Sequence, residues 1–211
     1  MSGERKIFVG IVVFIVVIFA GVVWLTGRGD SYDPRYILSN DTHLTGNADA
    51  KVLIVEFGDY ECPACGQMNT VFEDMLKNYS DPAKVSVGFR HFLIPSHKNA
   101  PMAAEAAEAA DAQSKFWEMH KKLYESQSDW ANLGNPYSVF EGYARNMGLN
   151  IVKFKADIHG EVYKDVINGD VTDGGRLGIN ATPTVFINGK KYVGVIQPDQ
   201  LKQIIDAELA K

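Results

Sequence analysis

The sequence predicts an α/β domain that is preceded by one N-terminal transmembrane helix. Residues 7–25 form an uninterrupted apolar run. Residues 51–79 read as a strand, a turn and a helix, and the turn carries both cysteines of the chain. Residues 184–209 read as a β-hairpin followed by an amphipathic helix. Strands that alternate with helical patterns in this way are typical of a sheet covered by helices.

The composition is that of a globular domain and argues against two other classes of protein, nucleic-acid-binding proteins and small disulfide-rich scaffolds. The chain has 211 residues, of which 46% are hydrophobic and 22% are charged, which is ordinary for a globular domain. This length fits one large domain or one domain with an insertion. The net charge is −5 and no basic block is present, so we expect no nucleic-acid partner. Two cysteines are too few for a small disulfide-rich scaffold.

Residues 7–25 are nineteen residues without a charge. A helix of that length is about 28 Å long, close to the thickness of the hydrocarbon core of a bilayer. The alternative is a cleaved signal peptide, whose apolar region usually has about 7–15 residues and ends in small residues. This run ends in Trp24 and Leu25. We therefore predict an uncleaved anchor at 7–25, with residues 1–6 as a cytoplasmic tail.

The positive charges on the two sides of the anchor are nearly equal in number, so they do not decide its orientation. Arg5 and Lys6 precede the run, and Arg28 and Arg35 follow it. The short basic N-terminal tail nevertheless resembles the start of a signal anchor. We therefore expect a single-pass protein of the cell membrane with its C-terminal domain outside the cytoplasm, as in bacteria.

Residues 26–47 are rich in Gly, Asp, Asn, Ser and Thr, and we predict that they form a linker to a domain at 48–211. Within that domain, the short β-branched run 51–57 predicts a buried strand. Apolar residues then recur at helical spacing up to Tyr79. Pro63 suits the first position of this helix, because its missing N–H has no partner there anyway.

This helix start places Cys62 at the N-cap and Cys65 at the third helical position. A helix N-terminus carries about half a positive charge and free N–H groups, which stabilise a thiolate at Cys62. The pKa of Cys62 is then expected below the value of about 8.5 for a free cysteine. Cys65 lies one turn further in and close enough to form a disulfide. One exposed thiolate with one shielded partner suits thiol–disulfide exchange.

Three other interpretations of the two cysteines stay open from the residues alone. A structural disulfide is one, although so short a loop gains least in the chain-entropy model. Half of a zinc site is another, with His91 and His97 as the remaining ligands, although the gap from Cys65 to His91 exceeds the usual spacing. Inert thiols in the core are the third.

The later elements follow from periodicity and from turn residues. Helices are predicted at 101–113 and 116–124, at 135–147, and once or twice within 151–179. His120 lies on an apolar helical face and is expected to be a core residue. Strands at 184–187 and 191–195 flank Asn188-Gly189, a type I′ turn signal. A last amphipathic helix follows Gln197.

Three segments, Val55 to Cys65, Lys115 to His120 and Gly178 to Gly189, resemble the thioredoxin superfamily. The closest resemblance is to the DsbA-like thiol:disulfide oxidoreductases in their membrane-anchored form, over roughly residues 40–211. The resemblance implies a thioredoxin fold with a helical insertion at about 97–178. This insertion separates the half with the C-x-x-C motif from the half with a cis-proline.

The resemblance also implies roles for single residues near Cys62. Pro183 matches the cis-proline of the family, and the backbone of Thr182 is expected to pair with an extended substrate peptide. Pro63 and Ala64, between the cysteines, belong to the same substrate-binding surface. From the residues alone, Pro183 is equally well an ordinary trans-proline at the start of a strand.

Glu56 matches a buried acid of the family that lies beneath the resolving cysteine. Burial raises the pKa of a carboxyl group, which then suits a proton relay to Cys65. The catalytic residues expected are therefore Cys62 as nucleophile, Cys65 as resolving thiol and Glu56 as relay. An exposed glutamate at a strand edge is the alternative for Glu56.

The function expected is the introduction of disulfide bonds into reduced secreted or membrane polypeptides, with no cofactor besides the redox-active disulfide and with no metal site. The resemblance implies a quinone-linked membrane partner that reoxidises the pair. Some relatives have a histidine between the two cysteines, whereas this chain has Pro63-Ala64 there. Without that extra cation the thiolate is less stabilised, which puts the oxidising power in question. The alternatives are a reductase or isomerase of the same fold, or a membrane-tethered, zinc-stabilised binding module without catalysis.

Overall fold

The computed structural model describes Tyr32 and residues 37–211. The predicted tail at 1–6, the predicted transmembrane helix at 7–25 and the start of the predicted linker lie outside the described residues. Among the residues that are described, no helix is both long enough and apolar enough to cross a membrane.

A mixed five-stranded sheet forms the centre of the domain, in the order β1-β3-β2-β4-β5. Strands β2 (Val52–Gly58) and β3 (Val85–His91) are parallel, and α3 (Pro63–Leu76) connects them. The other neighbouring strands are antiparallel. Every residue of β2 and β3 is buried, which explains why the sequence of β2 reads as a continuous apolar run rather than an alternating one.

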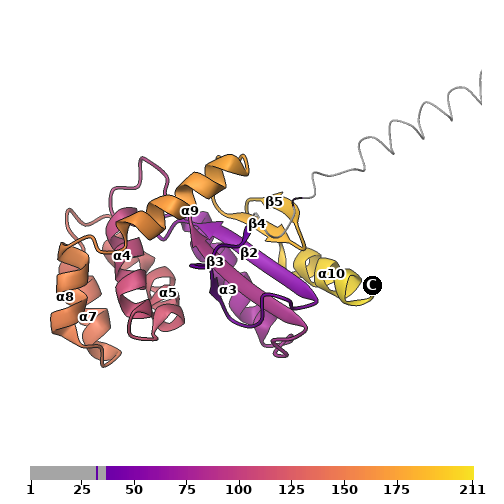
Figure 1. Ribbon diagram of the computed structural model, residues 1–211, viewed down its shortest axis with the longest axis horizontal. Coiled ribbons are helices and arrows are strands. Elements are labelled where there is room, and N and C mark those ends of the chain that lie inside the picture. The colour runs from indigo at the N-terminus through magenta and orange to yellow at the C-terminus, as the bar shows by residue number, and fades with distance from the viewer. Residues whose placement is uncertain (1–31, 33–36) are drawn as a thin grey trace, which may run out of the picture. The chain divides into compact units, whose positions relative to one another are not determined.

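Helices cover both faces of the sheet (Figure 1). Val52 and Ile54 of β2 pack in one core with residues of α3 and of α10 (Pro198–Leu209). The alternate residues Leu53, Val55 and Phe57 face a second core, which includes residues that follow α9 (Lys164–Arg176). Gly174 lets α9 approach the sheet closely, because a Cβ atom at this position would lie 2.5 Å from the ring of Phe92.

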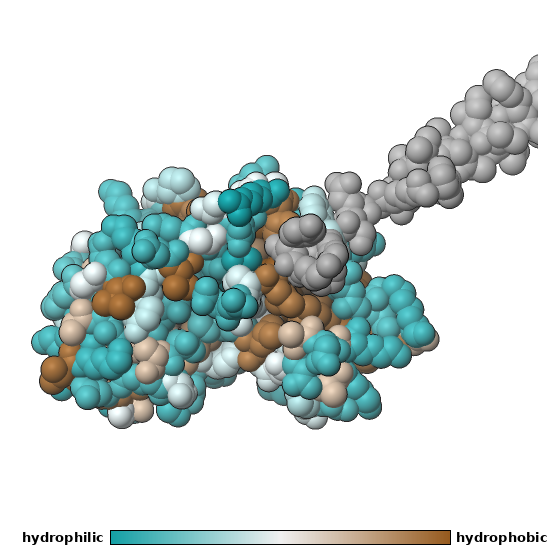
Figure 2. Space-filling view, in the orientation of Figure 1, coloured by the Kyte–Doolittle hydropathy of each residue, from teal (hydrophilic) through white to brown (hydrophobic). Residues whose placement is uncertain are grey.

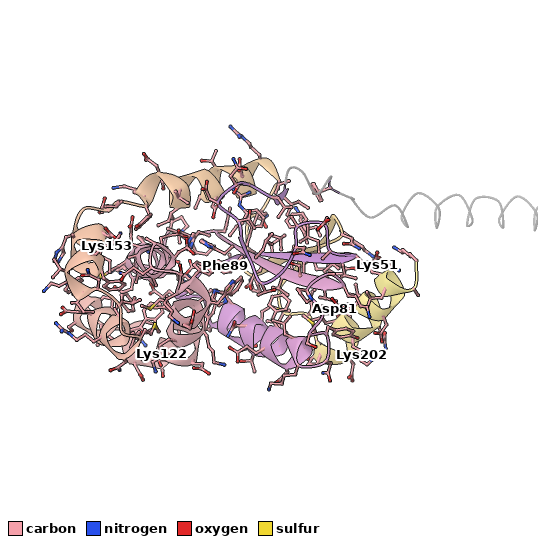
Figure 3. All side chains as sticks on the ribbon, turned by 60° about the horizontal axis from the view of Figure 1, so that its bottom comes forward. Lys51, Asp81, Phe89, Lys122, Lys153 and Lys202 are labelled. Carbon is pink, nitrogen blue, oxygen red and sulfur yellow. The ribbon has the colours of Figure 1, made fainter. Side chains whose placement is uncertain are left out.

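The helical insertion packs around α4 (Ala100–Asp111), whose alanines are all buried. It continues with α5 (Phe116–Glu125), α6 (Gln127–Trp130), α7 (Tyr137–Asn146) and α8 (Ile151–His159). Small side chains on α4 allow the neighbouring helices to approach closely. Figure 3 shows Phe89 of β3 at the junction of the sheet and these helices, where it belongs to the core of the insertion. All helices from α4 to α9 fall within the predicted insertion at 97–178.

The C-terminal hairpin has the predicted turn. Strands β4 (Thr184–Ile187) and β5 (Lys190–Val193) flank Asn188 and Gly189, whose φ angles are 45° and 80°. Two successive positive φ angles define a type I′ turn, which Asn-Gly favours. The second strand begins one residue earlier than predicted and ends two residues earlier.

The prediction of a linker over 26–47 is wrong at its C-terminal end. His43 and Leu44 form β1 and pair with Phe89 and Gly88 of β3, and Ile37 is only 2% exposed. A two-residue edge strand is too short to leave a periodic pattern in the sequence. Its position is set by the free edge of β3, which offers backbone partners.

Candidate active site

The two cysteines lie at the start of α3, as predicted. Cys62 is the N-cap residue with extended backbone angles, Pro63 is the first helical residue, and Cys65 is the third. The carbonyl oxygen of Cys62 accepts hydrogen bonds from the N–H groups of Cys65 and Gly66, at 3.1 and 3.2 Å. Cys62 is 8% exposed and Cys65 is 0% exposed, so only Cys62 is open to a partner.

A side chain from the insertion holds the turn before α3. Nε2 of Gln127, the first residue of α6, donates to the carbonyl oxygens of Tyr60 and Cys62, at 2.7 and 3.0 Å. No local pattern predicts this contact, since Gln127 lies 65 residues from Cys62 in a helix of only four residues.

Two carboxylates tie the same turn to α4. The backbone N–H groups of Asn99 and Ala100, at the start of α4, donate to Oε2 of Glu61 at 2.6 and 2.9 Å. Asp59 Oδ2 accepts from the N–H of Ile94 at 2.8 Å and lies 2.9 Å from Nδ1 of His97. These contacts satisfy free N–H groups and fix the cysteine turn against the insertion. Neither carboxylate was predicted from the sequence, because their partners lie 35 or more residues away.

The loop before β4 lies against Cys62. The Thr182–Pro183 peptide bond is cis, as the resemblance implied. In its thiol form, Cys62 Sγ donates to the carbonyl oxygen of Thr182 at 3.5 Å, across 120 residues of sequence. Pro63 is exposed and Ala64 is half-buried on the surface beside Cys62. The structure therefore brings together Cys62, the residues between the cysteines, and the cis-proline loop.

The local environment lowers the pKa of one thiol and raises that of the other. The pKa of Cys62 falls from 9.0 to about 5, chiefly because the Cys65 thiol donates a hydrogen bond to the thiolate. The Thr182 side chain and the backbone N–H groups of Cys65 and Ala64 add to this effect, and burial opposes it. Burial is also the main reason why the pKa of Cys65 lies well above its ordinary value. At neutral pH the pair thus holds one thiolate and one thiol.

Glu56 lies in the middle of β2, opposite Phe89 of β3 and Val185 of β4. It is 2% exposed, so the alternative of an exposed glutamate at a strand edge is wrong. Its Oε1 atom has no hydrogen-bond partner among the described residues. Burial raises its pKa to about 8, the negative charge of Cys62 adds to this, and a hydrogen bond from Cys65 opposes it. A buried carboxyl group with a raised pKa is the kind of group that general acid–base catalysis uses.

The histidines considered as zinc ligands contact carboxylates and not the cysteines. Nε2 of His91 lies 2.8 Å from Oε1 of Glu108, and His97 contacts Asp59. In the part of the chain that the structure describes, no group of metal-ligating side chains includes either cysteine. His120 is a core residue, as expected: its ring nitrogens lie 3.0 Å from the Tyr60 hydroxyl and 3.2 Å from Asn69 Oδ1. Burial lowers the pKa of His120 to about 3.

The sequence of the chain is similar to those of two kinds of known protein. The Na(+)/H(+) antiporter NhaA 1 of Mycobacterium sp. (strain KMS) is 33% identical over 170 residues. These residues are 78% of this chain but 26% of the antiporter, so the chain spans about a quarter of the relatives of this kind that it matches. A "probable disulfide bond formation protein D" of Bacillus anthracis is 29% identical over 229 residues, which cover 100% of this chain and 99% of that protein.

Solved structures show the same fold. The oxidised crystal structure of BdbD from Bacillus subtilis has a TM-score of 0.74 and 26% identity, covering 87% of this chain and 98% of BdbD. The structure of α-DsbA1 from Wolbachia pipientis has a TM-score of 0.74, with 23% identity over 84% of this chain and 96% of that chain, and shows the shared fold. Residues 38–207 match the thioredoxin family. The chain therefore belongs to the thioredoxin family.

Proposed function

We propose that this chain is a thiol:disulfide oxidoreductase that introduces disulfide bonds into polypeptides outside the cytoplasm. The observation that carries the proposal is the pair formed by an accessible Cys62 of lowered pKa and a buried Cys65 of raised pKa. The Thr182–Pro183 loop beside Cys62 offers backbone groups to an extended substrate. Similarity over the full chain to a protein named for disulfide bond formation supports the same function.

The reaction begins with the pair oxidised. A substrate thiolate attacks Cys62 Sγ, the bond between Cys62 and Cys65 breaks, and Cys65 takes up a proton as it leaves. A second substrate thiolate then attacks the substrate sulfur of the mixed disulfide and releases Cys62 as a thiolate. The substrate loses two electrons, and the cysteine pair gains them. The hydrogen bonds that stabilise the Cys62 thiolate make Cys62 a good leaving group.

Reduced secreted or membrane polypeptides are the proposed substrates. The cycle also needs an oxidant that accepts the two electrons, and the resemblance points to a quinone-linked membrane partner. Both proposals agree with a domain outside the cytoplasm, attached to the membrane by residues 7–25.

The redox equilibrium of the full chain, purified in mild detergent, tests this function. We expect a reduction potential above about −200 mV, because the reduced form is stabilised by the Cys62 thiolate. The chain is equilibrated with mixtures of reduced and oxidised glutathione, quenched in acid and alkylated with a mass-shifting reagent. A potential near the value of about −270 mV for thioredoxin would instead identify a reductase. A pair that does not cycle would refute catalysis.

The proposed proton relay through Glu56 predicts a change in pH dependence. In Glu56→Gln, the step in which Cys65 leaves is expected to be slower by roughly tenfold to a hundredfold, at the lower end of what general acid catalysis contributes. The rate profile is also expected to lose the inflection that comes from Glu56, because burial raises the pKa of this carboxyl group above its ordinary value. Stopped-flow mixing of the oxidised chain with a reduced peptide between pH 5 and pH 9 measures this.

Glu73→Gln is the matched control, since Glu73 lies on α3 but pairs with Lys121 near the surface. An unchanged pH profile in Glu56→Gln would show that Glu56 is only a buried structural group. The reduction potential of the same variant shows whether the pair itself is intact.

A further inference from the structure

Two buried oxygen atoms near the cysteine pair have no hydrogen-bond partner among the described residues. They are Oε1 of Glu56 on β2 and the hydroxyl of Tyr124 on α5. Glu56 is 2% exposed and Tyr124 is 5% exposed, so water at the surface does not reach either atom. Nearly all buried polar atoms in native proteins are hydrogen-bonded, and two exceptions in one place call for an explanation.

Gly58, the last residue of β2, shows that the two oxygens face the same space. A Cβ atom at this position would lie 3.0 Å from Glu56 Oε1 and 3.0 Å from the Tyr124 hydroxyl. The two oxygens are therefore at most about 6 Å apart, which is twice that distance. The same Cβ atom would lie 2.6 Å from the ring of Phe89, closer than real Cβ contacts. Glycine at this position thus keeps the space between the carboxyl group and the hydroxyl open.

We propose that the Tyr124 hydroxyl donates the hydrogen bond that stabilises the Glu56 carboxylate, which makes Tyr124 a positioning residue for proton transfer between Glu56 and Cys65. This inference rests on the proposed function of the cysteine pair. One water molecule with two hydrogen bonds of about 2.8 Å spans up to about 5.6 Å. Small rotations of the two side chains close the remaining distance.

The surroundings of Tyr124 keep its hydroxyl protonated. Burial holds the pKa of Tyr124 well above its ordinary value, and the negative charges of Cys65 and Glu56 raise it further. The hydroxyl is therefore a hydrogen-bond donor at neutral pH, and it lies near enough to both groups to respond to their charge. The ring centroid of Tyr124 lies 4.9 Å from that of Tyr60 and 5.1 Å from that of His120, and this packing fixes the ring.

The other described groups around Glu56 are poorly placed to donate to its carboxylate. Its neighbours in the sheet, Phe89 and Val185, have no polar side chain. The Tyr60 hydroxyl already lies 3.0 Å from Nδ1 of His120. The remaining titratable or charged groups near this space are Cys62, Cys65, Asp59, Glu73, Lys77 and Lys121. Both lysines lie near the surface and are paired with carboxylates there. The Tyr124 hydroxyl is thus the donor best placed for Glu56.

The hydroxyl is expected to matter most when the reduced pair is reoxidised. In that direction the Glu56 carboxylate takes the proton of Cys65. The Cys65 thiolate then attacks the Cys62 sulfur of a mixed disulfide, the bond between Cys62 and Cys65 forms, and the partner leaves as a thiolate with two electrons. A hydrogen bond to the carboxylate lowers the pKa of Glu56, so loss of the hydroxyl raises this pKa beyond the increase that burial causes. Fewer Glu56 side chains are then ionised at neutral pH, and the step slows.

Tyr124→Phe tests the inference, because it removes the hydroxyl and keeps the ring. The full chain in mild detergent, with the cysteine pair oxidised, is titrated by infrared spectroscopy, and the carboxyl band that is missing in Glu56→Gln reports Glu56. In Tyr124→Phe the midpoint of Glu56 is expected to rise by about one pH unit, a tenfold change in its ionisation constant.

The rate of reoxidation gives a second measurement. The reduced chain is mixed with oxidised glutathione in a stopped-flow instrument, and the resolution of the mixed disulfide is followed as a function of pH. At pH 7 this step is expected to be roughly threefold to tenfold slower in Tyr124→Phe. The two rates are expected to converge at high pH, where Glu56 is ionised in both chains. Tyr124→Phe is expected to have no further effect on the pH profile of Glu56→Gln.

Tyr143→Phe is the matched control, because Tyr143 is a buried tyrosine of the same core on α7, and neither Glu56 nor a cysteine affects its pKa. It is expected to leave the Glu56 midpoint and the pH profile unchanged. Equal Glu56 midpoints in Tyr124→Phe and the unmodified chain would overturn the inference, even in a chain that exchanges disulfides. A shifted midpoint in a chain that does not cycle would refute the proposed function and support the contact between Tyr124 and Glu56, so the two failures are distinguishable.

Discussion

The Cys62 thiol of the reduced chain is expected to ionise with a midpoint near pH 5, against an ordinary value of 9.0. At pH 7 about 99% of Cys62 is then thiolate, instead of about 1% for an unperturbed thiol. The largest cause is the hydrogen bond from Cys65, so Cys65→Ala is expected to raise the midpoint clearly. The thiolate absorbance at 240 nm, followed from pH 3 to pH 9, measures this.

Cys62→Ala is the control for this titration and is expected to show no transition near pH 5, because Cys65 stays protonated in its buried position. A midpoint near pH 8 or above in the unmodified chain would contradict the contacts described at the start of α3. It would also remove the main reason for expecting an oxidising potential.

The same shift has a consequence for stability. The folded pKa of Cys62 is lowered, so its stabilising contribution to the reduced chain is complete above pH 9 and disappears as the pH falls through 5. The oxidised chain has no thiol and lacks this contribution, whereas burial of Glu56 acts in both forms. The reduced chain is therefore expected to gain thermal stability relative to the oxidised chain between pH 5 and pH 9.

Arg90→Met is expected to lower the free energy of unfolding by about 3–5 kcal/mol, because it leaves a buried carboxylate without its cation. Arg90 is 1% exposed; its Nε donates to Asp170 Oδ1 at 2.7 Å, and its Nη2 donates to Asp173 Oδ2 at 2.9 Å. Burial already raises the pKa of Asp170 above 3.8, so the variant is expected to lose less stability at low pH, where this carboxyl group is protonated. Urea denaturation at pH 7 and pH 4 measures both effects.

Arg176→Met is the matched control, because Arg176 lies on α9, the helix that carries Asp170 and Asp173. Its guanidinium also pairs with Asp173, but the side chain is 77% exposed, so the expected loss is below about 1 kcal/mol. Equal effects of the two substitutions would show that the buried ion pair does not fasten α9 to β3. Because the chain runs from α9 into the Thr182–Pro183 loop, Arg90→Met is also expected to slow disulfide exchange.

The face drawn in Figure 2 is mainly hydrophilic, with several smaller apolar areas, the largest of them near the middle of the view. Among the described residues, the large exposed apolar side chains are Leu133 and Val162 in loops, Val152 on α8 and Val193 on β5. Single exposed apolar residues are normal on a protein surface.

The sequence alone determined the elements whose signals are local. Pro63 directly after Cys62 set the start of α3, and Asn188-Gly189 set the hairpin turn, because both depend on backbone geometry within a few residues. The C-x-x-C spacing put both thiols in the first turn of one helix. The transmembrane helix at 7–25 stays a prediction, since the structure describes none of its residues.

Only the tertiary structure decided which distant groups meet. The carboxylates of Asp59 and Glu61, the amide of Gln127 and the ion pair of Arg90 with Asp170 contact partners that lie 35 to 80 residues away. β1 was missed for the same reason, and so was the approach of Tyr124 to Glu56. Periodicity and turn residues report the conformation of neighbouring residues, whereas pairing across the fold depends on which surfaces the packed core brings together.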